Sequence, residues 1–209
     1  MAKLRSGILG NIRGKVAGVV GGQFKDVNYI REYVKPANPQ TAAQTVQRTK
    51  MTDTVAFSKV LVGPVFNSFT DKFQKSMSGF NFFVKRNIAI FDGTPDYSAI
   101  LLSEGKLSPI VVTTFTYNTG TGELAPQWSQ NLGNNGSGDD KVFWCIFDSG
   151  TGIWYFQDAV VARDGLADDQ TIATGLTVAN LKGYLICAQY IGTILSLISN
   201  SVYHQITAP

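Results

Sequence analysis

From residue 98 to the C-terminus, short apolar and β-branched runs alternate with turn signals. The runs include VVTTFTYN, VFWCIF, IWYFQDAVVA and KGYLICAQYI, and the turns include NTGTGE, DSGTG and RDGLADDQ. About seven short strands at this spacing are typical of an antiparallel sandwich. The pattern therefore predicts an acidic β-sandwich domain over residues 97–209, of the immunoglobulin (Ig) or fibronectin type. The Cys-Trp-Cys spacing of antibody domains is absent, since Trp144 adjoins Cys145.

Before the strands, the apolar period is that of helices. A helix is predicted over residues 38–63, because Asn38 can cap it, Pro39 suits its first position and Gly63 ends it. A second helix is expected to begin near Pro64. Its apolar stripe favours the core of a helix hairpin over a ligand site and consists of Phe66, Phe69, Phe73 and Met77. The segment FNFFVKRNIAIF, after a break at Ser78-Gly79, predicts a third short helix.

Residues 7–35 predict a β-hairpin or short meander, because glycines punctuate β-branched runs and VNYIREYVK alternates as a strand. Neither face of this ribbon is cleanly polar. A small ribbon with two half-apolar faces is not stable alone, so we expect it to pack against the rest of the chain or a partner. Ribbon and helices form the first predicted domain, a basic assembly region over residues 1–96. The predicted class is therefore α+β.

The net charge of +3 conceals an uneven distribution along the chain. Residues 1–50 carry nine Lys or Arg against two carboxylates, whereas residues 89–209 carry four against eleven. A basic arm can meet nucleic acid, or it can meet the acidic half of another copy of the chain. Both partners stay open at this point.

No membrane segment is predicted. Arg13 and Lys15 interrupt the apolar run that a signal peptide would need, and the apolar stretch 191–198 is too short to span a bilayer. We therefore expect a protein made in the cytoplasm, without a signal peptide or a membrane span.

The two cysteines, Cys145 and Cys187, each lie in an apolar, strand-like run. Without a signal sequence, they are expected to be buried thiols that act as small apolar residues. A disulfide across the sandwich is the alternative.

The glycine-rich segment GNIRGKVAGVVGG, residues 10–22, does not match a phosphate-binding loop. A Walker loop has four residues between its glycines and then Lys-Ser or Lys-Thr, whereas Gly10 and Gly14 enclose three and Val16 follows Lys15. The dinucleotide fingerprint is also missing. We expect the glycines to permit close backbone approach, as at subunit contacts. The predicted assembly residues of this segment are Arg13, Gly14, Lys15, Gly18, Gly21 and Gly22.

No catalytic, cofactor-binding or metal-binding constellation emerges. His204 is the only histidine, so a histidine-based metal cluster is excluded, and a nucleophile elbow G-x-S-x-G is absent. The paired carboxylates at 139–140 and 168–169, and Asp148, lack calcium-loop spacing and are expected to be solvated turn residues. The chain is therefore predicted not to be an enzyme, and no cofactor is expected.

Aromatic residues crowd the runs VFWCIF and IWYF, and alternation makes both faces of this hairpin apolar. One face is expected to fill the sandwich core. The second must be covered by the helices, a neighbouring subunit or a ligand such as a glycan. A glycan-binding surface would require Trp144 and Trp154 to be exposed.

Several motifs together resemble a family of uncharacterised proteins of about this length from Bacteroidota and their phages. They are the N-terminal G-x-x-G-x-x-R-G-K-V of residues 7–16, the N-P-x-T-x-x-Q-x-x-x-R of residues 38–48, N-S-V-Y at 200–203, and the segments DDKVFWCIFDSGTG and AVVARDG. The N-P-x-T segment is also similar to ones in phage structural proteins. The resemblance draws attention to Gln44 and Arg48, which lie four apart on one helix face. There they can bind oxygens of the ribbon or of a neighbour, or simply be solvated.

The resemblance and the charge distribution together predict a non-enzymatic virion protein. It would be a capsid-associated, spike or tail component of a phage or phage-like particle, with itself and other particle proteins as partners. A nucleic-acid-binding protein that uses the basic arm, and a glycan-binding surface module, are the alternatives.

Overall fold

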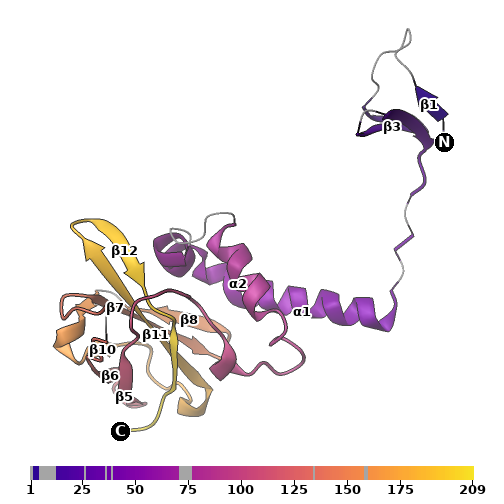
Figure 1. Cartoon of the computed structure of the whole chain (residues 1–209). Helices are drawn as coiled ribbons and strands as arrows, with labels where there is room; N and C mark the ends of the chain where they lie inside the picture. Colours follow the sequence, from indigo (N-terminus) through magenta and orange to yellow (C-terminus); the bar gives the residue numbers. More distant parts are fainter. Residues whose placement is uncertain are drawn as a thin grey trace. The chain divides into compact units, whose positions relative to one another are not determined.

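The chain divides into two units, Met1–Gln44 and Thr45–Pro209, in a computed structural model (Figure 1). The residues that the structure describes are 2–4, 13–25, 27–35, 37–38, 40–70, 77–133, 135–157 and 160–209. The boundary at Gln44 differs from the one predicted near residue 96. The reason is that the helices after residue 45 share a core with the C-terminal strands.

The N-terminal unit holds a four-stranded antiparallel sheet in the order β1-β4-β3-β2. Its strands are β1 (Ala2–Leu4), β2 (Gly14–Val16), β3 (Val19–Phe24) and β4 (Val27–Glu32). Val16 pairs with Val19 across β2 and β3, and Gly21 pairs with Ile30 across β3 and β4. The glycines from position 14 to position 22 thus lie in strands and in a tight turn.

The helical segment begins with α1 (Ala42–Ser58), later than the predicted start, and Pro39 lies outside the described residues. The predicted stop at Gly63 is wrong, because the backbone continues through a 3₁₀ turn, η1 (Lys59–Leu61), into a π-helix, η2 (Val62–Thr70). Burial of Val65, Phe66 and Phe69 explains why tertiary packing overrides the local stop signal. These phenylalanines are core residues, as predicted, whereas Phe73 of the same stripe lies outside the described residues.

The third predicted helix is present as α2 (Gly79–Asn87). It starts after the predicted break at Ser78-Gly79, and the structure adds that Ser78 caps it: the Ser78 Oγ accepts a hydrogen bond of 3.3 Å from the Asn81 backbone N–H. A single 3₁₀ turn, η3 (Tyr97–Ala99), follows before the strands begin.

The described strands after η3 form two antiparallel sheets. The smaller has the order β10-β6-β5 and consists of β5 (Val111–Tyr117), β6 (Glu123–Ser129) and β10 (Gln170–Thr171). The larger has the path β12-β11-β7-β8, with β13 paired to β11 and β9 to β7. Its strands are β7 (Lys141–Asp148), β8 (Ile153–Phe156), β9 (Val161–Ala162), β11 (Leu181–Ile191), β12 (Ile194–Ile198) and β13 (Val202–Gln205).

The larger sheet is buried on both faces. One face packs against the smaller sheet, and this sandwich core includes Phe115, Trp128, Trp144 and Leu185. The other face packs against the helices, where Phe57, Phe66 and Phe83 meet Phe147, Trp154 and Tyr184. Of the three covers considered for the second apolar face, the structure has the helices. The predicted α+β class with sandwich-like sheets is confirmed.

Cys145 and Cys187 are free, buried thiols, so the predicted reduced state is confirmed and the disulfide alternative is wrong. They lie on neighbouring strands but on opposite faces of the larger sheet: Cys145 belongs to the helix-side core and Cys187 to the sandwich core. Burial raises the pKa of both thiols.

The helix-side core depends on Phe57, whose ring centroid lies 4.7 Å from that of Phe147 and 5.0 Å from that of Trp154. Replacing Phe57 with Ala is expected to lower the free energy of unfolding by about 3–5 kcal/mol, because it leaves a cavity in a well-packed core. Denaturant unfolding of the full chain measures this loss. Val60→Ala, at a side chain that is 52% exposed, is the matched control and should change stability by less than about 0.5 kcal/mol. Equal effects of the two substitutions would contradict the packing of the helix on the sheet.

The buried thiols should be inert in the folded chain, because the raised pKa leaves little of the nucleophilic thiolate near pH 8. We expect neither cysteine to react with Ellman's reagent within minutes under native conditions, and both to react once guanidinium unfolds the chain. Fast native reaction of either thiol would show that its core opens readily.

Candidate functional site

The N-terminal sheet carries large apolar side chains that the rest of its unit does not bury. Six of them are 42–72% exposed: Val16, Val19, Phe24, Val27, Tyr33 and Val34. Among the described residues up to Gln44, only Gly21 is buried. The register divides these side chains between the two faces of the sheet: Val16 and Val19 pair on one face, and Phe24 and Val27 pair on the other. Exposed apolar side chains that gather in this way mark an interaction site.

One face of this sheet has a hollow of 160 Å³, here called the apolar hollow, and its described lining residues are Val16, Val19, Gly21 and Ile30. The strand register explains the lining. Val16 lies opposite Val19, and Ile30 lies opposite Gly21, so the glycine leaves open space between three branched side chains.

The neighbouring Gly22 serves the opposite face. A Cβ atom at Gly22 would lie 2.8 Å from the ring of Tyr29, so only glycine lets this ring cover β3 closely. The close approach predicted for the glycines is therefore intramolecular at this position. Gly14 has φ of +97°, which favours glycine at the start of β2, and at Gly18 an added Cβ would meet nothing within 4 Å.

Two cations of the N-terminal unit, Lys15 and Arg13, have partners within it. Lys15 Nζ lies 3.6 Å from the centroid of the Tyr33 ring, and the Arg13 guanidinium donates to the Gln23 side chain. A second hollow of 410 Å³, the basic hollow, has Arg13, Gly22, Gln23 and Lys25 among its lining residues. Arg13 and Lys25 make it attractive to anions.

Gln44 and Arg48 are exposed on the first half of α1, one turn apart. The Gln44 backbone N–H donates to Thr41 Oγ1 at 3.4 Å, and the Arg48 carbonyl accepts from Thr52 Oγ1 at 2.9 Å. Their predicted role in binding the ribbon or a neighbour stays a prediction.

The exposed aromatic surface predicted as one option at Trp144 and Trp154 is wrong, because the two residues are 0% and 7% exposed. They point to opposite faces of the larger sheet, and each face is covered. Trp144 Nε1 donates to the Asp168 carboxylate at 2.7 Å, and Trp154 Nε1 donates to the Phe57 carbonyl at 3.2 Å. The glycan-binding alternative loses the residues on which it depended.

The pattern of one protein family, described as a family of unknown function (DUF6266), matches residues 11–204. The chain belongs to this family. No curated protein and no solved structure matches it. For this DUF6266 chain, any assignment of function therefore depends on its own surfaces.

Two carboxylates of the DUF6266 chain are buried, so their prediction as solvated turn residues is wrong. Asp148 accepts hydrogen bonds from the Gly150 backbone N–H at 2.9 Å and from Thr151 Oγ1 at 2.7 Å, and it thereby shapes the turn between β7 and β8. Asp140 pairs with Arg163, whose side chain is fully buried, at 3.1 Å.

Arg163 fastens the long loop before β7 to the sandwich, a role that the sequence analysis missed. Its Nε donates to the Gln130 carbonyl at 2.5 Å, and its Nη2 donates to the carbonyls of Ser108 at 2.7 Å and Asn131 at 2.6 Å. The segments DDKVFWC and AVVARDG, which the family resemblance singled out, are joined by the ion pair to Asp140. The available signal was an arginine inside an apolar strand run.

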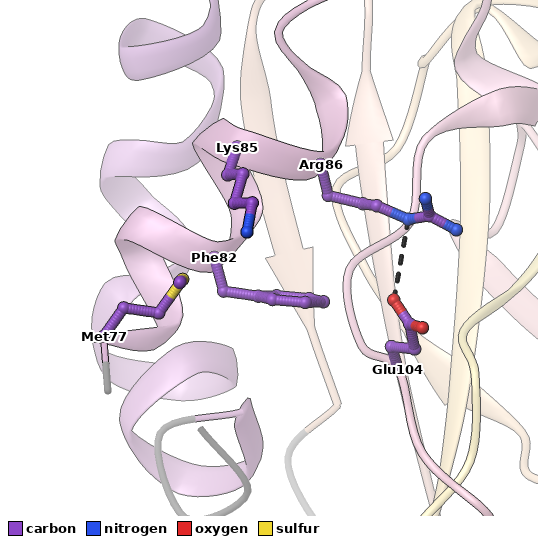
Figure 2. Close-up of a pocket in the computed structure, with 5 residues that line it drawn as sticks. All are labelled: Met77, Phe82, Lys85, Arg86 and Glu104. Atoms are coloured by element: carbon purple, nitrogen blue, oxygen red, sulfur yellow. Dashed lines mark ion pairs between the residues drawn. The ribbon is translucent and has the colours of Figure 1, made fainter. Parts of the chain in front are cut away.

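A pocket of 330 Å³ beside α2 has Met77, Phe82, Lys85, Arg86 and Glu104 among its lining residues (Figure 2). In Figure 2 the Arg86 side chain points toward Glu104, and their charged groups lie 3.5 Å apart. Both side chains are about half exposed, so water competes for this ion pair. Among the described lining residues, the charged groups of Arg86 and Glu104 are therefore solvated.

Within the described part of the DUF6266 chain, no three His, Cys, Asp or Glu side chains gather as metal ligands do. No helix there is long and apolar enough to cross a membrane. His204 lies on β13, where its ring centroid is 6.5 Å from that of Phe115 and its Nδ1 is buried without a hydrogen-bond partner among the described residues.

Replacing Arg163 with Ala should lower the free energy of unfolding by about 3–5 kcal/mol, because Asp140 would stay buried without its partner. Denaturant unfolding of the full chain provides the measurement. Arg86→Ala removes an exposed ion pair and is the control, with an expected loss below about 1 kcal/mol. A loss for Arg163→Ala no larger than the control's would show that the loop does not depend on the buried guanidinium.

Proposed function

We propose that this chain is a non-enzymatic structural protein that assembles with copies of itself in a phage or phage-like particle. The observation that carries the proposal is the exposed apolar surface of the N-terminal sheet. The finer architecture is part of the proposal: a basic N-terminal ribbon and a helical region for assembly, followed by an Ig-like or fibronectin-like sandwich that faces outward.

The energetics of the sheet favour this proposal. A sheet of four short strands needs a covered apolar face for stability, and the described residues of its unit bury no large apolar side chain. Covering a Val or Phe side chain that is more than half exposed contributes roughly 1–2 kcal/mol. Several such contacts between copies would stabilise both the sheet and the assembly.

Charge supplies an orientation for the contact. Residues 1–50 are strongly basic and residues 89–209 strongly acidic, so opposite ends of two copies attract each other. The particle context, with a capsid-associated, spike or tail position in a virion, comes from the resemblance of the N-terminal motifs to phage structural proteins.

The basic hollow supports one alternative, binding of nucleic acid. Arg13 and Lys25 line it, and phosphate groups bind such pairs of cations. This alternative gives a different result in the experiment below.

The proposal predicts that the purified full chain is oligomeric at micromolar concentration by light scattering or sedimentation. Replacing the two most exposed apolar residues of the unit, Phe24 and Val34, with Ser should weaken association at least about tenfold, which is 1.4 kcal/mol. Ile153→Ser, at a 50% exposed position on β8, is the matched control and should associate like the unchanged chain.

A chain that stays monomeric at high concentration would refute the proposal. If such a monomer binds duplex DNA with an affinity that falls steeply with salt, and substitution of Arg13 and Lys15 reduces that dependence, the nucleic-acid alternative takes its place.

A further inference from the structure

The hairpin of β11 and β12 carries a second exposed apolar feature, far along the sequence from the N-terminal sheet. Its tip residues Ile191 and Ile194 are 70% and 73% exposed. They lie directly opposite each other in the strand register, so their side chains share one face of the hairpin. Figure 1 shows this yellow hairpin projecting from the sheets of the C-terminal unit.

The tip is held in one shape. Gly192 occupies the first position of the two-residue turn with φ of +63°, as a type II′ hairpin turn requires. The base of the hairpin is anchored, because Leu195 and Ile198 are buried against Phe69 of the π-helix. Two β-branched side chains on a rigid, anchored hairpin lose little conformational entropy when they enter a partner.

We infer that this hairpin tip inserts into the apolar hollow of the N-terminal sheet of a second copy of the chain. The inference rests on the proposed function, because it names the contact through which copies assemble. The contact would join Ile191 and Ile194 of one copy to the residues that line the hollow of the other, which include Val16, Val19, Gly21 and Ile30.

Size and chemistry match between tip and hollow. At 160 Å³ the hollow is smaller than ligand pockets, which measure about 300–1,000 Å³. An apolar cavity of about 150 Å³ holds a group as large as benzene, so a branched aliphatic side chain fits. The side chains among the described lining residues are those of Val and Ile. They carry no hydrogen-bonding groups, so an isoleucine that enters the hollow leaves no polar side chain buried and unpaired.

Charge selects the same pairing. The hollow belongs to the basic N-terminal unit, and the hairpin lies within residues 89–209, which carry four Lys or Arg against eleven carboxylates, so long-range attraction favours contact between hollow and tip of different copies. Tip and hollow are different surfaces, so each copy offers one of each. A contact of this kind is head-to-tail and continues into a ring or a filament. Each contact buries a small area, but a ring or filament contains many identical contacts, which together stabilise the assembly.

Cysteine cross-linking of the full chain tests the pairing. One variant carries Ile194→Cys and the other Val16→Cys, and the two are mixed and treated with a short bismaleimide. The native thiols are buried, so they should not interfere. Mass spectrometry distinguishes the products, because the variants differ by one CH₂ group. The mixed dimer should exceed the share expected from random pairing.

Two other cross-linking results would overturn the inference. Preferential pairing of Val16→Cys chains with each other would show that the N-terminal sheets associate face to face. Closure of a chain with both substitutions into a cross-linked monomer at high dilution would show that the hairpin meets its own sheet.

Ile194→Asp gives a second test, with Ile153→Asp as the matched control on another exposed strand position. The first substitution should weaken association at least about tenfold and the second should not. Equal association of the two variants, in a chain that does assemble, would refute the hairpin contact and leave the proposed function standing. A monomeric unchanged chain would refute both.

Discussion

The structure depends on a sheet whose two faces are both apolar. β7 and β11 pair over eight residues, and alternation along them sends Trp144 and Leu185 into the sandwich and Cys145 and Tyr184 toward the helices. A sheet of this kind is stable only when both sides are covered. The smaller sheet covers one side and the helical segment covers the other, so helices and strands fold as one unit. The described residues of these two cores all belong to the unit Thr45–Pro209.

The buried ion pair of Arg163 and Asp140 holds the long loop before β7 against the sandwich. A guanidinium can satisfy several carbonyls at once, and Arg163 binds those of Gln130, Asn131 and Ser108 while it pairs with Asp140. Without such a donor, the loop carbonyls at this position would be buried unpaired or the loop would stay solvated. A buried guanidinium thus supplies hydrogen bonds to backbone carbonyls that have no partner in the strands.

The sequence predicted what periodicity controls and missed what tertiary contacts decide. The strand runs, the core phenylalanines, the helix that begins after the break at Ser78-Gly79 and the free thiols follow from local patterns, and the structure has them. The helix stop at Gly63 failed because burial of Val65 and Phe66 outweighs a local signal. Asp140 and Asp148 were expected in solvent. A turn-rich context gives no sign of Arg163, which approaches Asp140 from elsewhere, or of the turn hydrogen bonds that Asp148 accepts. The apolar hollow could not be predicted either, since it needs the register that places Gly21 beside Ile30.

The two units differ in how far they bury their apolar side chains. The C-terminal unit buries its apolar side chains on three layers and still leaves an isoleucine pair exposed on a rigid hairpin. The N-terminal unit has apolar side chains without a layer to cover them. Exposed apolar surface costs free energy in water wherever it lies, so a chain with a surplus at both ends gains when the ends of different copies meet. Because those ends also carry opposite charge, the contact that removes the apolar surface is the contact that electrostatics favours.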